Sequence, residues 1–170
     1  WNRGLVAAGG DGFGSRLAQQ VSKFGLAQSF QSFSTAYSDT GLFGIYLVSD
    51  HLYDLDDLIY HVQQEWVRLC LAVTEGEVER AKSHLKSALL LSLDSTSAIT
   101  EDIGRQVLAY GRRIGLPEVF TQIEAVDAGV VKRVASAYLY DRCPAVVGMG
   151  AIGSMPDYNR IRASTHWLRN

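Results

Sequence analysis

The chain has 170 residues, about the length of one domain, and 47% of them are hydrophobic, which is enough to form a core and excludes a low-complexity tail. Its 16 Lys and Arg against 18 Asp and Glu give a net charge of −2, so charge favours no nucleic-acid partner and no acidic membrane surface. The longest nearly apolar stretches, 88–93 and 143–153, fall far short of the roughly 18 residues that a membrane span requires.

The two cysteines, Cys70 and Cys143, cannot build a multi-disulfide framework, and neither has a second Cys or a His at metal-ligand spacing. So few cysteines without a disulfide pattern favour a reducing compartment. The chain opens at Trp1, without an initiator methionine or a basic-then-apolar leader. We therefore interpret it as a processed, truncated or otherwise incomplete piece of a longer protein.

Residues 1–14 are dense in glycine and have no sustained period, which predicts a connecting loop. A G-x-G-x-x-G phosphate motif starting at Gly10 would need glycine where Ser15 stands, so we disfavour it. The next segment predicts a short helix that begins after Ser15 and ends at Gly25. Its apolar face consists of Leu17, Val21 and Phe24.

Residues 27–37 and 42–48 are rich in aromatic, β-branched and hydroxyl side chains, which favours two strands. Turn-forming residues separate them at 38–41, so we predict a β-hairpin. Alternation puts Phe43 and Leu47 on one side of the second strand with Ile45, an apolar face that requires a cover of helices.

Apolar residues at three- and four-residue steps predict a long amphipathic helix from Leu55 to about Val73, which we expect to grip the sheet through Trp66. Thr74 and Glu77 form a capping box, which starts a second long helix. We expect its buried stripe to be Val78, Ala81, Leu85, Ala88 and Leu89. Its solvated face is expected to be Glu79, Arg80, Lys82 and Lys86.

Three further helices are predicted. One is capped by the hydroxyls at 95–97 and ends at Gly111, the next has Pro117 at its first position, and the last is capped by Asp127. In the last we expect the inward residues to be Val130, Val131, Val134 and Tyr138. The apolar run 145–150 predicts a buried strand.

Strands and helices are segregated along the chain, so the predicted class is α+β, an antiparallel sheet with helices packed on one face. Three strands are too few to cover this length of helix, and an outer strand would be left as an unprotected edge. We infer that part of the sheet is missing from this chain.

The sequence contains few residues in patterns typical of catalytic or metal-binding sites. The four histidines, His51, His61, His84 and His166, include no helical pair at metal-ligand spacing. We interpret His61 and Glu65 as a surface polar pair rather than an acid/base pair, because a third partner is lacking. Cys70 is expected to be a small buried hydrophobe and Cys143 structural, and Arg112-Arg113 to complement a helix dipole. We therefore predict no catalytic, cofactor-binding or metal-ligating residue.

Several stretches resemble one branch of the pitrilysin-type (M16) zinc metallopeptidases, the branch of the processing peptidase β subunits and the complex III core proteins. The resemblance covers nearly the whole chain from Ser15 onward, and implies an incomplete C-terminal M16 domain over 15–170 after the glycine-rich connection 1–14. The stretches that carry it are Ser29–Phe33, Tyr37–Leu42, Glu65–Cys70, Thr74–Val78, Glu101–Gln106, Tyr110–Arg113, Pro156–Arg162 and Trp167–Arg169.

In that family the zinc site is an inverted H-x-x-E-H motif in the N-terminal half. The motif is absent from these 170 residues, so zinc would be bound only by the missing half. Active single-chain relatives carry a substrate-holding arginine and tyrosine about where Ser22 and Gln28 stand, so those roles do not transfer.

The resemblance implies a C-terminal fragment of a core subunit on the matrix side of the mitochondrial inner membrane, structural in complex III. The resemblance is also compatible with a part in presequence processing. The alternative is the β subunit of a soluble, catalytically active processing peptidase that removes presequences, and the interpretation without the resemblance is a generic α+β interaction domain. Implied partners are the upstream segment of the same subunit, core protein 2 or an α-type peptidase subunit, and other complex III subunits, with no nucleic acid and no direct membrane span. Metalloendopeptidase activity would require the upstream half and the α-type partner, so we expect none from this chain alone.

Overall fold

The computed structural model describes residues 15–37, 39–50 and 54–166. The expectations for residues 1–14 and for His51 lie outside these ranges. The chain divides into two compact units, one formed by 1–71 with 135–170 and the other by 72–134. We call them the first and the second unit and describe each by itself.

The first unit begins with α1, Arg16–Phe24, whose two ends are those that the sequence predicts. The Ser15 hydroxyl accepts a hydrogen bond from the Ala18 amide, at 3.2 Å. Gly25 has a φ of 64°, and its N–H donates to the Val21 carbonyl. A side chain with a Cβ rarely adopts that left-handed backbone, so glycine is favoured at this helix end.

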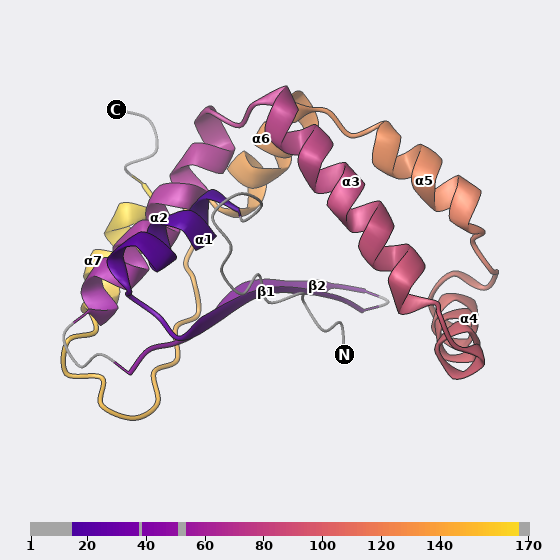
Figure 1. Cartoon of the computed structure of the whole chain (residues 1–170). Helices are drawn as coiled ribbons and strands as arrows, with labels where there is room; N and C mark the ends of the chain where they lie inside the picture. Colours follow the sequence, from indigo (N-terminus) through magenta and orange to yellow (C-terminus); the bar gives the residue numbers. More distant parts are fainter. Residues whose placement is uncertain (1–14, 38, 51–53, 167–170) are drawn as a thin grey trace. The chain divides into compact units, whose positions relative to one another are not determined.

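The predicted hairpin follows as β1, Ser29–Ala36, and β2, Gly41–Val48, which pair antiparallel over their full lengths (Figure 1). Phe33 lies opposite Gly44 in the register. A Cβ at position 44 would lie 2.6 Å from the Phe33 ring. The glycine therefore leaves the space that the aromatic ring occupies on this face of the sheet.

The core of the first unit lies where α2, Leu55–Leu71, meets α1 and the hairpin. Leu58 is fully buried and forms a cluster with buried Val21 and Leu26. The partly buried residues packed against this cluster are Leu17, Ala27, Phe30 and Leu47. The expectation that Trp66 grips the sheet is therefore wrong, because Leu58, two helical turns earlier, occupies that position. Trp66 is only half-buried.

Alternation along β2 explains which sheet face is covered. Leu47 packs on the core, as predicted, whereas Phe43 on the same side is 57% exposed. The opposite face presents exposed Leu42 and Tyr46 together with Phe33. The helices of this unit thus cover only one end of one face of the hairpin.

The C-terminal part of the first unit holds one helix that the sequence analysis missed, α7, Tyr158–Ser164. Its N-cap is Asp157, whose carboxylate accepts from the Asn159 amide at 3.0 Å. Ile161 is buried, and its carbonyl accepts from the Gln63 side chain of α2 at 3.0 Å. This short helix therefore packs on α2.

The predicted strand at 145–150 is wrong. These residues form no strand, and the sheet of the described residues contains β1 and β2 alone. Val147 is 93% exposed and Met149 100% exposed. A strand requires a neighbour to complete its backbone hydrogen bonds, and none of the described segments supplies one here.

The second unit is helical. It contains α3, Glu75–Ser92, α4, Thr96–Tyr110, α5, Leu116–Glu124, and the first part of α6, Ala128–Tyr138. The predicted starts are confirmed: Thr74 and Glu77 form both bonds of the capping box, and Ser95 and Asp127 cap α4 and α6.

Several burial predictions fail in these helices, and one of the failed residues is Ala81, expected inside α3 but exposed. Lys82, expected in solvent, is 8% exposed because its ammonium donates to the Glu79 carboxylate at 2.7 Å and to the Glu124 carbonyl at 3.2 Å. Leu85, expected inside, is exposed. In α6 the small side chains of Ala128 and Ala135 are buried, whereas the larger ones of Val134 and Tyr138 are exposed.

The class is α+β, as predicted, with seven helices and one two-stranded antiparallel sheet in the described residues. Within this part of the chain, no helix combines the length and the apolar character that a bilayer crossing would demand.

Candidate functional site

Titratable residues do not converge on a metal centre in the described ranges, where no group of three or more His, Cys, Asp or Glu is placed to hold an ion. The described residues therefore do not form a site for the zinc ion that the resemblance to M16 peptidases implies. His61 stacks on Phe24, with ring centroids 5.4 Å apart, and meets Tyr60 edge-on. Glu65 pairs instead with Arg68 at 2.9 Å and Arg16 at 3.3 Å. The ion pair with Arg16 joins α1 to α2, and the pair with Arg68 lies within α2, so both are structural.

The two positions that stand where relatives carry substrate-holding residues are both exposed. Ser22 lies on α1. Gln28 lies just before β1, where its side-chain amide donates to the Asp50 carboxylate at 3.0 Å and its backbone N–H donates to the Val48 carbonyl. Gln28 thus links the residues just before β1 to the end of β2 and the residue Asp50 that follows it.

The cysteines differ in environment. Cys70 is buried beside Ala135, as expected for a small hydrophobe. Burial raises the pKa of its thiol, and a hydrogen bond with Ser136 opposes that rise. Cys143 is exposed, which the sequence analysis did not foresee, and its sulfur accepts from Arg162 Nε at 3.1 Å.

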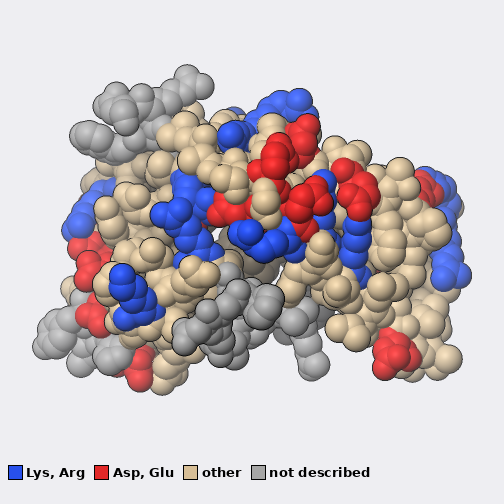
Figure 2. All heavy atoms as spheres, turned by 45° about the horizontal axis from the view of Figure 1, so that its top comes forward, with Lys and Arg blue, Asp and Glu red and all other residues tan. Residues whose placement is uncertain are grey.

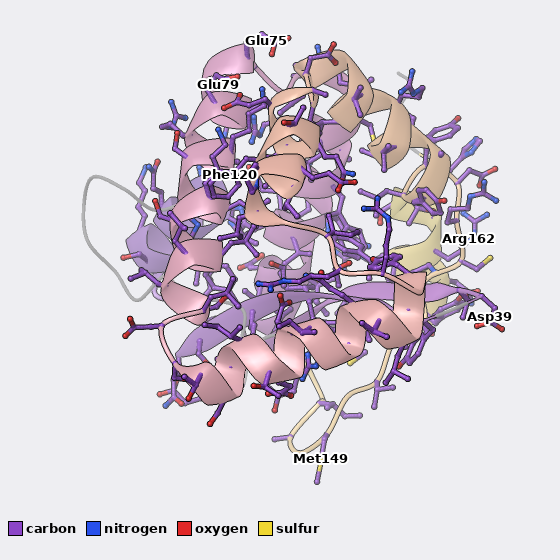
Figure 3. The ribbon with its side chains drawn as sticks, turned by 90° about the vertical axis from the view of Figure 1, so that its right-hand side faces the viewer. Asp39, Glu75, Glu79, Phe120, Met149 and Arg162 are labelled. Atoms are coloured by element: carbon purple, nitrogen blue, oxygen red, sulfur yellow. The ribbon has the colours of Figure 1, made fainter. Side chains whose placement is uncertain are left out.

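Arg162 joins α7 to the segment that follows α6. Its guanidinium donates to the Asp141 carboxylate at 2.7 Å and to the Thr165 hydroxyl at 2.8 Å. Asp141 has a φ of 51°, and its N–H donates to the Thr165 carbonyl. The hydrogen bond from Arg162 lowers the pKa of Asp141, and the same bond raises that of Arg162. This cluster fixes a turn; Figure 3 labels Arg162 within it.

Several basic residues of the second unit are also paired with carboxylates. Arg112 makes two hydrogen bonds to Glu118, at 2.6 and 2.9 Å, which join the end of α4 to the start of α5. This corrects the expectation of a simple dipole complement. Lys86 pairs with Glu124 and lies 6.0 Å from the Phe120 ring (Figure 3).

Acidic and basic side chains are interspersed on the face that Figure 2 shows, and its described residues form no large area of one sign. On this face, the distribution agrees with the small net charge of the chain.

The unusual surface feature is apolar. In the first unit, Leu42, Phe43 and Tyr46 of β2 are exposed, and the loop 144–153 presents Val147 and Met149 (Figure 3). In the second unit, Leu91 is 75% and Leu108 89% exposed, and α4 and α5 bury no residue fully. A contiguous patch of exposed apolar side chains is typical of a surface that contacts other protein. The candidate contact residues are therefore the exposed apolar side chains of β2, of the loop 144–153, and of α3 and α4, which motif searches do not detect.

Comparison with known proteins gives the family. Residues 8–85 match the model described as the Peptidase M16 inactive domain. Residues 8–85 therefore carry a domain of the M16 peptidase family, and the fold described for this part of the chain agrees with that assignment.

Within that family it is similar to two kinds of mitochondrial protein. It is 46% identical to the mitochondrial-processing peptidase subunit beta of Bos taurus over 170 residues, all of this chain and 34% of the relative. It is 50% identical to the mitochondrial cytochrome b-c1 complex subunit 1 of Bos taurus over 161 residues, 95% of this chain and 33% of the relative. The chain thus spans about a third of the length of these relatives.

One solved structure extends the match to three dimensions. A chain of Complex III2 from Candida albicans, Inz-5 bound, superposes with a TM-score of 0.85 at 35% sequence identity. The superposition covers 90% of this chain and 37% of that chain. The branch inferred from short sequence stretches is therefore confirmed, and the two kinds of relative are not separated by identity.

Proposed function

We propose that the chain is a structural part of a core subunit of mitochondrial ubiquinol-cytochrome c reductase, complex III, on the matrix side of the inner membrane. The observation that carries the proposal is the superposition of 90% of the chain on a complex III chain at a TM-score of 0.85. The 50% identity to cytochrome b-c1 complex subunit 1 supports it.

The exposed apolar residues support an assembly role physically. Val147 in the first unit, and Leu91 and Leu108 in the second, are largely exposed, and burial of each against a partner would be favourable. Permanent subunit interfaces are enriched in such side chains. The partners proposed are core protein 2 or an α-type subunit and other complex III subunits.

The first partner proposed is a segment of the same subunit upstream of this chain. A two-stranded sheet is marginal in water, and the outer edges of β1 and β2 have no neighbouring strand in the described residues. The run 145–150 also has no strand beside it among the described residues. Added strands would complete the backbone hydrogen bonds at these edges.

Co-expression tests this partner. The 170 residues alone should bind a hydrophobic dye and unfold without cooperativity, and should become monodisperse and cooperative with the upstream segment. A soluble monomer that unfolds cooperatively without any partner would refute the proposal that an upstream segment completes the sheet. The assignment to complex III would not be affected, because a separate experiment tests it.

Assembly is tested on the endogenous protein carrying an affinity tag. We expect it to migrate on native gels with the absorbance of cytochromes b and c1. Val147→Asp, which puts a charge on the exposed loop, should reduce the assembled fraction several-fold, whereas Ser83→Asp, at an exposed polar position of α3, should not. A tagged wild-type protein found only in smaller species without cytochromes would overturn the proposal.

A second candidate function is favoured by the 46% identity to processing peptidase β subunits over the whole chain. In that case the zinc and the catalytic groups would lie outside the described residues, and this chain would support the catalytic half. Purified assembly should then cleave a presequence peptide and lose that activity with chelator. Cleavage by an assembly without cytochromes supports this alternative; cytochromes without cleavage support a purely structural subunit.

A further inference from the structure

We draw no further inference here: the strongest candidate, the exposed Cys143 thiol beside Arg162 in the side-chain cluster between the segment after α6 and α7, is a lone cysteine, and no second observation in the described residues points to a ligand or a reactant at that place.

Discussion

Replacing Leu58 by alanine tests the assignment of the core of the first unit. Leu58 is fully buried between α1 and the hairpin, and the change removes three carbon atoms. Loss of the burial of these three groups costs about 2.4 kcal/mol, at roughly 0.8 kcal/mol for each carbon group removed from the apolar core. A residual cavity of roughly 50 Å³ adds about 1 kcal/mol. We therefore expect a loss of about 3 to 4 kcal/mol.

Hydrogen exchange of the purified protein measures this loss locally, without assuming that a large assembly unfolds in two states. Amides of α1 and β2 that exchange through opening of this core should exchange more than about 100-fold faster in Leu58→Ala, because roughly 1.4 kcal/mol corresponds to a factor of ten. Peptides from α5 in the second unit serve as the internal reference.

The matched control is Leu71→Ala, on the same helix, where the side chain is 53% exposed. A surface change of this kind should alter stability by at most about 0.5 kcal/mol, or exchange by about twofold. Equal effects of the two substitutions would refute the packing of Leu58 against Val21, Leu26 and the hairpin.

Three further predictions follow from local contacts. With a disulfide reagent at pH 8, Cys143 should react at least about tenfold faster than Cys70, because burial removes access to Cys70 and raises the pKa of its thiol. Thr74→Ala should cost about 1 kcal/mol by removing the N-cap of α3, measured as faster exchange in the first turn of that helix. Glu118→Gln should destabilise the α4 to α5 connection at pH 7 and have no effect in strong acid. The hydrogen bond from Arg112 lowers the pKa of Glu118, so its contribution is present above the ordinary glutamate pKa and is lost as pH falls through the lowered value.

Each has a control. In denaturant the two cysteines should react at similar rates, and equal rates in the native protein would contradict the burial of Cys70. Thr121→Ala, on the exposed surface of α5, removes only the hydrogen bond from its hydroxyl to the Pro117 carbonyl and should not destabilise its helix, so a loss as large as that of Thr74→Ala would argue against a capping effect. A Glu118→Gln effect that persists in strong acid would show that the ion pair with Arg112 is not its cause.

Helix starts and most helix ends could be predicted from the sequence because caps are local. The Ser15 and Ser95 hydroxyls bond to amides three residues away, and Gly25 and Gly111 adopt the left-handed backbone that ends a helix. All the information needed lies within a few residues of each helix terminus. The absence of a predicted catalytic residue followed from the same local reasoning.

Burial could not be predicted equally well because it depends on the neighbour. Lys82 is buried since α5 supplies a carbonyl oxygen for its ammonium, 42 residues further along the chain. The hydrophobic periodicity of α3 gives no information about that carbonyl oxygen, because the oxygen belongs to another helix. The same reason explains Trp66: its place on the apolar stripe was evident, but which stripe residue meets the hairpin is decided by the position of α1.

The run 145–150 shows where local and distant information conflict. Its composition favours a strand, yet the described residues offer no backbone to pair with it, and its apolar side chains are exposed. Intrinsic preference for the strand conformation is worth at most about 1 kcal/mol per residue and depends on neighbours. A loop in this chain and a strand in a completed sheet are therefore both consistent with the same sequence. Hydrogen exchange of this run distinguishes them: fast exchange in the isolated chain and at least about tenfold slower exchange with the upstream segment is the expected result, and equal rates would show that the run is a surface loop in both.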